Sequence, residues 1–467
     1  MSIIFDTNKS FEYSIPVIVV GSGGCGLSAA LAVKETGADV LVIERDPTPL
    51  GTTAMSTGLI PGANTRFQRE AQIDDSPDLF KKDILNKTKG QTNEEIALNL
   101  AEESAETVEW LVDNHQVPLS LVDTFLYPGH SVMRMHGTPN RTGSELMGSL
   151  CIAAERSQVD ILTNALVTDL FSDDDKCILG VKVLMADGEI QEIGCDALIL
   201  ACCGFAGNSE MVEEYMPEIK EAEFFGHPGN KGDAIRWGKS LGAAMADISS
   251  YQGHGGLAAG RGVPILWPMI MEGAYQINEQ GLRFSDESKG YSEQAVEVVK
   301  QPNKVAWNIF DERLHKLMLE FEDYHNAIEA NAIIRAESIE ELSEITGIEH
   351  LRLKQTIMDV EDMVDGKKED DFGRIFTEKP KLSPPYFAVK VTGALFHTQG
   401  GLVVDKNARV LDEEGNQLPN LYAGGGSARG ISGPADWGYM AGNGLLTATT
   451  FGRLAGKSAA ALIKKMK

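Results

Sequence analysis

The stretch SIPVIVVGSGGCGLSAALAVKETGADVLVIERD, residues 14–46, decides the fold. Residues 15–20 form an apolar run rich in β-branched side chains, which is typical of a strand buried on both faces. The turn Gly21–Gly26 follows and fits the pattern G-x-G-x-x-G. An alanine-rich helix is predicted over residues 27–36, and a second buried strand over residues 38–43. This order predicts a βαβ unit that binds a dinucleotide.

The residues of this unit have separate tasks at a dinucleotide site. Glycines in the turn let the backbone approach a pyrophosphate at the helix N-terminus, where unpaired N–H groups and the helix dipole favour an anion. Glu44 closes the second strand, where a carboxylate accepts hydrogen bonds from both ribose hydroxyl groups. We therefore expect cofactor contacts from Gly21, Gly23, Gly24, Gly26, Glu44 and Arg45.

The sequence after the acid indicates which dinucleotide is bound. Residues 51–58, GTTAMSTG, stand where a nicotinamide-binding domain usually continues with its next βα unit. This run is similar to the segment of FAD-binding flavoproteins that passes along the pyrophosphate and the flavin. CDALILACCGFAGN (195–208) and LPNLYAGGGSARG (418–430) are similar to the strands that complete the FAD site in that class. No second G-x-G-x-x-G follows a later strand, so we expect no separate NAD(P)H domain.

The resemblance to these flavoproteins implies FAD, bound non-covalently. It also implies further cofactor contacts from Gly51, Thr52, Thr53, Ala54, Ser56, Gly58, Val167, Ala201, Gly204, Gly425, Gly426, Leu445 and Leu446.

Composition and charge exclude several classes of function. The 467 residues carry 42 Lys and Arg against 68 Asp and Glu, and the formal net charge of −26 repels nucleic acid and anionic membrane surfaces. The N-terminal segment shows no basic region followed by an apolar core, and no apolar run is long enough for a membrane helix. The six cysteines form neither a haem-attachment motif nor a spaced metal cluster. We expect a cytoplasmic protein with reduced thiols and without stable membrane insertion.

The character of the sequence changes twice along the chain. From about residue 249 a glycine-rich loop is followed by amphipathic helices such as SIEELSEITG, where Ser338 and Glu341 fit a capping box. The flavoprotein character resumes near Pro385. The expected architecture is α/β: a Rossmann-like FAD-binding domain of residues 1–248 and 380–467, with an inserted α+β capping domain of residues 249–379.

These motifs together resemble the flavoprotein superfamily of soluble fumarate reductases and 3-oxosteroid 1-dehydrogenases. The resemblance covers nearly the whole chain and is specific at GTTAMSTG, ACCGFAGN, RFSDE, HTQGG and the segment from NLYAGGG to GNGLLTATTFGRLAG. It implies a FAD-dependent oxidoreductase that acts on CH–CH groups.

Tyr291, in FSDESKGYSEQ (284–294), stands at a position that divides this superfamily. In fumarate reductases a segment such as RFVNE is followed, at a fixed offset, by an arginine that delivers a proton. In the steroid dehydrogenases the same offset carries a tyrosine that removes one. The resemblance therefore implies that Tyr291 is a base, with Tyr127 of TFLYPGHS as a candidate helper for its ionisation. The alternative is that Tyr291 is only a packed aromatic residue.

Two histidines fall at positions that bind substrate in fumarate reductases. FHTQGG (396–401) resembles their HHTMGG, and His397 matches the histidine that binds a substrate carboxylate, whereas the steroid enzymes usually carry lysine and glycine there. His254 matches the histidine of their His-Pro-Thr motif, although Gly255 and Gly256 replace the Pro-Thr. The alternative for both is a structural hydrogen-bonding role.

The segment before the last helix favours a ketone over a dicarboxylate. Fumarate reductases place a carboxylate-binding arginine three residues before the glycine of GNA, and here Tyr439 precedes Gly442. Without that arginine the bidentate contact to a second carboxylate is lost. By resemblance to the steroid dehydrogenases, Tyr439 and a Gly442 N–H would polarise a substrate ketone. Arg429 either holds one carboxylate or pairs with acids of the inserted domain.

The combination of Tyr291, His397 and Tyr439 predicts a dehydrogenase (desaturase). It would form a C=C bond α,β to the carbonyl of a small cyclic oxo-acid or ketone, similar to 4-oxocyclohexanecarboxylate or a 3-oxosteroid. Tyr291 would remove the proton and flavin N5 would take the hydride, with an electron acceptor that the sequence does not identify. The alternatives are a fumarate-reductase-like enoate or enone reductase and, at greater distance, a non-catalytic flavin-binding protein. Flavin hydroxylases and amine oxidases share the nucleotide motif but not RFSDE with HTQGG.

Overall fold

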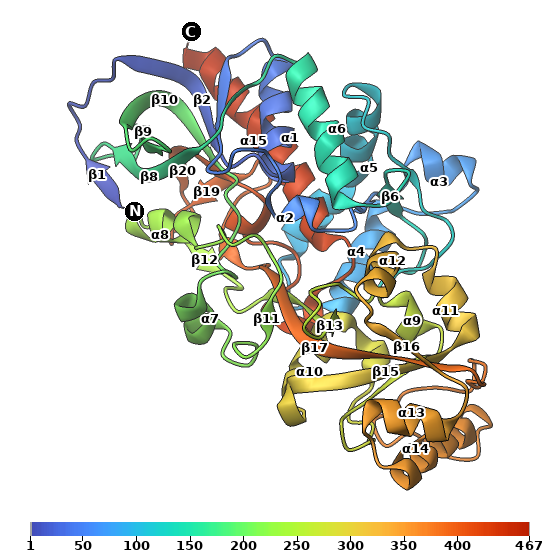
Figure 1. The fold of residues 1–467 in the computed structure, drawn as a ribbon. Helices are drawn as coiled ribbons and strands as arrows, with labels where there is room; N and C mark the ends of the chain where they lie inside the picture. Colours follow the sequence, from blue (N-terminus) through green and yellow to red (C-terminus); the bar gives the residue numbers. More distant parts are fainter. Residues whose placement is uncertain (1, 467) are drawn as a thin grey trace. The chain divides into compact units, whose positions relative to one another are not determined.

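The computed structural model describes residues 2–466 and divides the chain into two compact units (Figure 1). Unit 1 consists of the chain up to Tyr215, Gly226–Tyr251 and the chain from His397 onward. Unit 2 consists of Met216–Phe225 and Gln252–Phe396. Compared with the expected insertion of residues 249–379, unit 2 starts at Gln252 instead of residue 249. It also holds 216–225 and 380–396, because strands from both segments hydrogen bond into its sheet.

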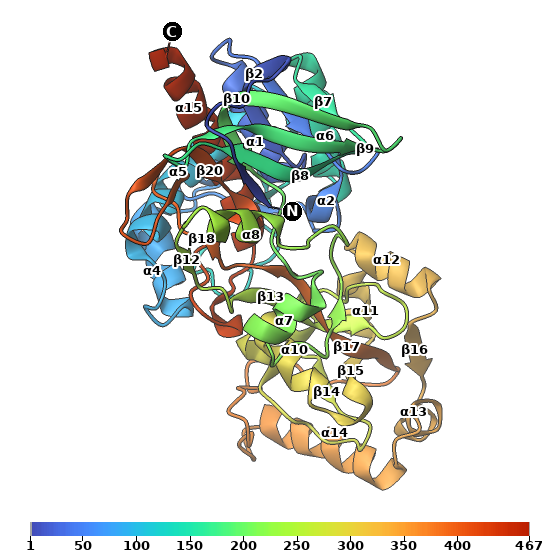
Figure 2. The ribbon, with the colours of Figure 1, turned by 90° about the vertical axis from the view of Figure 1, so that its left-hand side faces the viewer.

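The main sheet of unit 1 contains the predicted βαβ unit. Its order is β1-β8-β9-β10-β2-β3-β7, with β20 paired to β10 and β19 to β20. The pairs β10–β2, β2–β3, β3–β7 and β10–β20 are parallel, whereas β8, β9 and β10 form the antiparallel part that lies side by side in Figure 2. The strands are β1 (Ile3–Phe5), β2 (Tyr13–Val20), β3 (Val40–Ile43), β7 (Asp160–Leu162), β8 (Ala165–Ser172), β9 (Ile178–Met185), β10 (Ile190–Leu200), β19 (Arg409–Leu411) and β20 (Gln417–Ala423).

Helix α1 (Gly24–Lys34) packs against the last helix, α15 (Asn443–Met466), as Figure 1 shows for the blue and red helices. A Cβ atom on Gly452 would lie 2.3 Å from the carbonyl oxygen of Cys25, and one on Gly456 would lie 2.2 Å from that of Ala29. The two glycines therefore let the helix backbones touch. The predicted helix of residues 27–36 starts earlier than expected, because the last glycines of the motif already have helical geometry.

Smaller elements complete unit 1. The order β4-β6-β5 forms a small sheet, and β12 pairs with β18. These elements are α2 (Gly51–Ala54), α3 (Arg66–Glu70), α4 (Pro77–Lys87), α5 (Glu94–Asp113), α6 (Gly143–Arg156), α7 (Ser209–Tyr215), α8 (Asp233–Ser240), η3 (Gly425–Ser427), η4 (Asp436–Gly438), β4 (Ile60–Pro61), β5 (Ser120–Leu121), β6 (Met135–Gly137), β12 (Met245–Ala246) and β18 (Gly401–Leu402).

Unit 2 has its own sheet and its own apolar core. The order is β11-β17-β15-β14, and β13 and β16 also pair with β17. Its elements are β11 (Glu223–Phe224), β13 (Tyr251–Ala258), β14 (Tyr275–Ile277), β15 (Val305–Asp311), β16 (Ile333–Ala336), β17 (Tyr386–Thr398), η1 (Glu287–Lys289), η2 (Pro302–Lys304), α9 (Pro268–Met271), α10 (Tyr291–Val299), α11 (Glu312–Met318), α12 (Glu322–Glu329), α13 (Ile339–Thr346) and α14 (His350–Val364).

Half of the expected capping box is present at α13. The Ser338 hydroxyl accepts a hydrogen bond from the Glu341 N–H at 3.2 Å. The Glu341 carboxylate accepts from the N–H of Glu337 rather than from that of Ser338.

Among the helices of residues 2–466, none is both long and apolar enough to cross a lipid bilayer.

Candidate functional site

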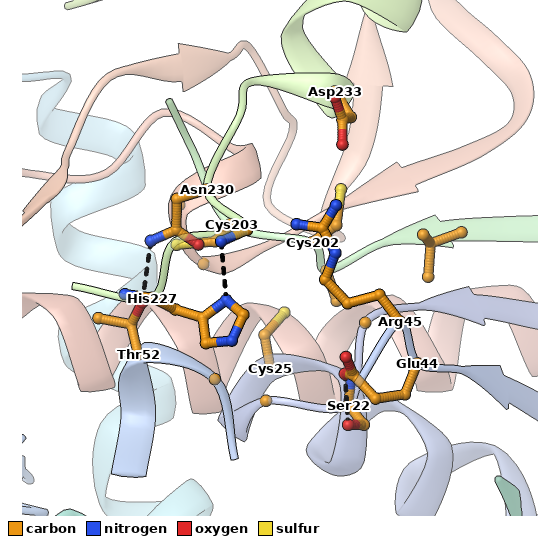
Figure 3. A pocket seen from close by; sticks show the side chains of 18 of the residues that line it. Ser22, Cys25, Glu44, Arg45, Thr52, Cys202, Cys203, His227, Asn230 and Asp233 are labelled. Atoms are coloured by element: carbon orange, nitrogen blue, oxygen red, sulfur yellow. Dashed lines mark hydrogen bonds between the residues drawn. The ribbon is translucent and has the colours of Figure 1, made fainter. Parts of the chain in front are cut away.

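A pocket in unit 1 opens where β2, β3 and β10 end, at the carboxyl edge of the parallel strands (Figure 3). Open parallel sheets bind nucleotides at this edge. The predicted contacts that line the pocket are Gly21, Gly23, Gly24, Glu44, Arg45, Gly51, Thr52, Thr53, Val167, Ala201, Gly425 and Gly426.

The turn after β2 depends on glycine for two different reasons. Gly21 has φ +101°, and a Cβ there would lie 2.6 Å from the carbonyl oxygen of Ala201. A Cβ on Gly26 would lie 1.8 Å from the carbonyl oxygen of Gly21, so Gly26 closes the turn. At Gly23 the nearest atom to an added Cβ is Thr53 Oγ1 at 3.6 Å, which leaves the backbone open toward the pocket. The turn therefore has the shape that a pyrophosphate requires.

Glu44 is fixed at the predicted position. One carboxylate oxygen accepts hydrogen bonds from the backbone N–H and the hydroxyl of Ser22, at 2.9 and 2.6 Å. The other accepts from the Asp46 N–H at 3.0 Å. The side chain is buried and lines the pocket, at the position predicted for a ribose-binding acid.

The segment that follows residue 225 forms a wall of the pocket that the sequence did not indicate. Asn230 Nδ2 donates to Thr52 Oγ1 at 2.9 Å (Figure 3). His227 Nε2 lies 2.7 Å from an oxygen of Asp46. Trp237 also lines the pocket, and its indole N–H has no hydrogen-bond partner within residues 2–466. Further lining residues that were not predicted are Val20, Ser22, Cys25, Ile43, Asp46, Ala165, Leu166, Cys202, Cys203, Gly229, Asp233 and Ala448.

Several predicted cofactor residues lie outside this pocket lining. Gly26 and Gly204 are packing positions, since a Cβ on Gly204 would lie 1.8 Å from Thr398 Oγ1. Ser56 accepts the N–H of Gly143 at the start of α6 through its carbonyl oxygen, at 2.6 Å. The others outside the lining are Ala54, Gly58, Leu445 and Leu446.

A second cluster in unit 1 surrounds the N-terminus of α15. The rings of His397 and Tyr439 have centroids 5.8 Å apart and are nearly perpendicular. A Cβ on Gly444 would lie 2.9 Å from His397 Nε2 and 3.6 Å from the Tyr439 hydroxyl oxygen. The two side chains therefore flank one point at the start of the helix. Gly442 has φ +82°, and a Cβ there would lie 2.7 Å from Pro61 Cδ. Gly444 lies beside the tyrosine hydroxyl, whereas the resemblance pointed to Gly442.

Burial keeps both groups of this cluster neutral. Burial raises the pKa of Tyr439, and a backbone hydrogen bond with Gly444 lowers this pKa by a smaller amount. Burial lowers the pKa of His397, and a backbone hydrogen bond to Thr398 raises this pKa by a smaller amount. A neutral phenol and a neutral imidazole beside helix N–H groups suit a carbonyl or carboxylate oxygen.

The loop that carries Tyr127 packs against the same region of unit 1. Tyr127 contacts the small apolar cluster of Leu59, Val122, Met135 and Ala441. Burial raises the pKa of Tyr127 to about 12, with Arg141 acting in the opposite direction. The phenol is therefore a hydrogen-bond donor, not an anion, at neutral pH.

Arg429 has an acidic partner close at hand. Its Nε donates to a carboxylate oxygen of Asp247 at 2.6 Å. Asp247 belongs to unit 1, so the partner is not one of the acids expected from the inserted domain. The pairing occupies one edge of the guanidinium.

Tyr291 begins α10 in unit 2 and lies in an aromatic cluster. Its ring stacks on His254 at 5.2 Å and meets Trp267 edge-on at 6.1 Å. His254 is also stacked on Phe396 at 5.3 Å, and its Nδ1 accepts the Gly256 N–H at 3.1 Å. Burial lowers the pKa of His254 to about 3, so this histidine is neutral at physiological pH.

The RFSDE motif forms buried ion pairs just before the start of α10. Arg283 bonds Glu287 at 2.6 Å and also pairs with Asp370, and Arg374 lies 3.1 Å from Glu287. Glu287 accepts the Gln276 N–H as well, at 2.8 Å, and all four charged side chains are buried. These bonds fix the turn that leads into Tyr291.

The parallel sheet, the glycine turn and the buried acid at the strand end define a dinucleotide-binding protein of the Rossmann type. The chain belongs to the FAD binding domain family, whose model matches residues 16–445. The predicted fold class, the FAD cofactor and the class of FAD-dependent oxidoreductase are thereby confirmed.

Relatives with known names support this placement. The chain is 29% identical over 446 residues to a probable fumarate reductase of Shewanella frigidimarina, covering 95% of this chain and 74% of that protein. The open conformation of a flavocytochrome c3 fumarate reductase superposes with a TM-score of 0.83 at 28% identity, over 97% of this chain and 79% of that one. The 3-ketosteroid Δ1-dehydrogenase of Sterolibacterium denitrificans shares the fold, with a TM-score of 0.79 at 23% identity over 96% and 99% of the chains.

Proposed function

We propose that this protein is a FAD-dependent desaturase that forms a C=C bond α,β to the carbonyl of a small cyclic oxo-acid or ketone. The observation that carries the proposal is the neutral pair His397 and Tyr439 at the start of α15. A phenol hydroxyl and helix N–H groups form a good site for a ketone oxygen that becomes an enolate, whereas a second carboxylate needs a cation. The 4-oxocyclohexanecarboxylate type of acid combines one ketone with one carboxylate.

The charges of unit 1 support a substrate with at most one carboxylate. Tyr439 stands where the resemblance expects an arginine, and Arg429 is held by Asp247. His397, Arg429 and, from unit 2, His254 are the proposed substrate-binding residues. His254 contributes a ring face and not a charge, because it is neutral and stacked. A dicarboxylate would therefore leave one negative charge without a cationic partner.

The proposed chemistry divides the tasks among these residues. Tyr439 and the backbone N–H of Gly442 hold the ketone oxygen and stabilise negative charge on it. Tyr291 removes the proton from the neighbouring carbon, and Tyr127 is the proposed helper for its ionisation. When bound, FAD supplies a two-electron acceptor for the hydride that leaves the substrate. The acceptor that regenerates the cofactor, the non-covalent attachment and the cytoplasmic location stay predictions.

Reduction is the second candidate reaction. The named fumarate reductases among the relatives favour it, and a tyrosine that removes a proton in one direction donates it in the other. Saturation of an enoate or enone would use the same residues. A reduced viologen dye as electron donor distinguishes this direction from oxidation with a dye acceptor.

Anaerobic titration of the purified flavoprotein tests the substrate class. We expect 4-oxocyclohexanecarboxylate to bleach the flavin absorbance, because it supplies both the ketone for Tyr439 and one carboxylate for His397. Succinate is the matched control, since it has two carboxylates and no ketone. Bleaching by succinate and not by the oxo-acid would overturn the proposal, and oxidation of reduced viologen by fumarate alone would establish the reductase.

A further inference from the structure

The turn that carries the proposed ketone site is held from behind by a buried histidine. His130 Nε2 lies 2.9 Å from the carbonyl oxygen of Ala441. The preceding residue, Gly129, packs on Met440, since a Cβ there would lie 2.8 Å from Met440 Cγ. Two consecutive residues of one loop thus contact two consecutive residues of the turn between Tyr439 and Gly442. All of these residues belong to unit 1.

The proton position on His130 is determined by its two partners. Arg134 Nη1 lies 3.1 Å from His130 Nδ1, and a guanidinium can only donate. Nδ1 is therefore the acceptor, and the proton of the neutral ring sits on Nε2, which donates to Ala441. Burial is the main cause that lowers the pKa of His130 to about 4, and Arg134 lowers it further, so the ring is neutral at physiological pH.

Arg134 is itself fixed by two carboxylates from distant parts of unit 1. Its side chain is fully buried, bonds Asp75 through Nε at 3.0 Å and Nη2 at 2.8 Å, and bonds Asp83 through Nη1 at 2.6 Å. The guanidinium also lies over the ring of Phe80. Such a bidentate, fully enclosed arginine has one orientation. It therefore presents an N–H to His130 Nδ1.

The hydrogen bond to Ala441 decides which way a peptide group faces. In a planar trans peptide the carbonyl of Ala441 and the N–H of Gly442 point in opposite directions. Gly442 has φ +82°, and a glycine permits both orientations of the preceding peptide. A flip would replace a donor with a carbonyl oxygen, which repels an enolate. The Ala441–Gly442 peptide must therefore be held in one orientation if the Gly442 N–H is to donate a hydrogen bond to the substrate oxygen.

We propose that His130 is a positioning residue: its Nε2–H holds the Ala441–Gly442 peptide so that the Gly442 N–H and Tyr439 face the substrate oxygen. Asp75, Asp83 and Arg134 hold His130 in the required tautomer. This inference rests on the proposed function, since it assigns the buried cluster to the ketone site. His130 acts through the backbone and touches neither substrate nor cofactor.

Two substitutions test the two nitrogen atoms of the His130 ring, Nδ1 and Nε2, one at a time. His130→Asn keeps an acceptor at the level of Nδ1 for Arg134 but does not reach Ala441. His130→Gln keeps a donor at the level of Nε2. With 4-oxocyclohexanecarboxylate and a dye acceptor, we expect His130→Asn to lower kcat about 10- to 100-fold with little change in KM. We expect His130→Gln to restore most of the turnover.

Ser131→Ala is the matched control in the same loop. It removes the 2.8 Å hydrogen bond from the hydroxyl to Asp83, at the same cluster, without a contact to the turn. We expect its kcat to equal that of the wild type. FAD content and unfolding temperature are measured for all variants, so that a loss of fold is not read as a loss of positioning. Equal kcat values for the Asn and Gln variants, or a wild-type kcat for His130→Asn, would overturn the proposal.

A spectroscopic measurement decides the tautomer without any substrate. In holoenzyme labelled with ¹⁵N-histidine, the His130 signals are assigned by difference from His130→Gln. We expect Nε2 to carry the proton and Nδ1 to lack it, and a proton on Nδ1 would overturn the inference. Failure of the proposed function is recognised separately, because the wild-type enzyme itself would then show no turnover with 4-oxocyclohexanecarboxylate, whereas the tautomer measurement needs no substrate.

Discussion

Tyr291→Phe is expected to lower turnover by about 10²- to 10⁴-fold, the contribution typical of a positioned general acid or base. The phenylalanine ring preserves the stacking on His254 and the edge contact with Trp267, so the aromatic cluster stays intact. FAD remains bound, because the residues of the cofactor pocket all belong to unit 1 and Tyr291 belongs to unit 2. Stopped-flow measurement of flavin reduction under anaerobic conditions gives the rate, and the visible spectrum gives the FAD content.

Tyr275→Phe is the control for the loss of a phenol hydroxyl in unit 2. Tyr275 is buried in the core of that unit, and its hydroxyl has no hydrogen-bond partner within residues 2–466. We expect this variant to keep wild-type turnover. Should Tyr291→Phe also turn over at a near-normal rate, the tyrosine is a packing residue and the base must be sought elsewhere.

Gly26→Ala is expected to abolish FAD binding and to lower the free energy of unfolding by about 3 kcal/mol or more, at or beyond the upper end for overpacked sites. The new Cβ would lie 1.8 Å from the carbonyl oxygen of Gly21. That carbonyl cannot yield easily, because the Gly21 N–H is bonded to Ile43 at 2.9 Å and the turn abuts Ala201. The turn must open, and the backbone N–H groups leave the positions that a pyrophosphate needs.

Gly148→Ala provides the contrast in another helix of unit 1. Gly148 lies within α6, and no atom stands within 4 Å of an added Cβ. We expect a gain of about 0.5–1 kcal/mol in stability there, from the better helix propensity of alanine. Chemical denaturation and the flavin absorbance of the purified variants measure both effects. Retention of FAD by Gly26→Ala would show that the turn is more pliable than its packing indicates.

The local part of the site was predictable from the sequence, since its residues stand close together in the chain. Residues 15–44 fold as one βαβ unit, so the strands, the turn, the helix and Glu44 could all be predicted from the local sequence pattern. The same holds for Thr52 and Thr53, which follow the acid directly and line the pocket. Gly26 and Gly204 were predicted as cofactor residues because their motif fits, and the structure shows close backbone packing at both positions.

The parts that the sequence did not reveal depend on long-range contacts. His227, Asn230 and Trp237 line the pocket only because the chain returns to unit 1 after a short excursion, and no motif marks that return. Arg134 meets Asp75 and Asp83 from positions 59 and 51 residues away in sequence. Three buried charges without a shared motif look like ordinary surface residues in a sequence, since charged side chains are rarely buried.

The bond between Asn230 and Thr52 has a consequence for the life of the protein in a cell. It joins two segments that are distant in the chain and that meet only when unit 1 is complete, at the pocket on the carboxyl edge of the sheet. A ligand that binds only the folded state adds about 2.7 kcal/mol of stability at a hundredfold excess over its Kd. Chains without FAD are therefore expected to open more often than the loaded protein and to be cleaved faster by a protease.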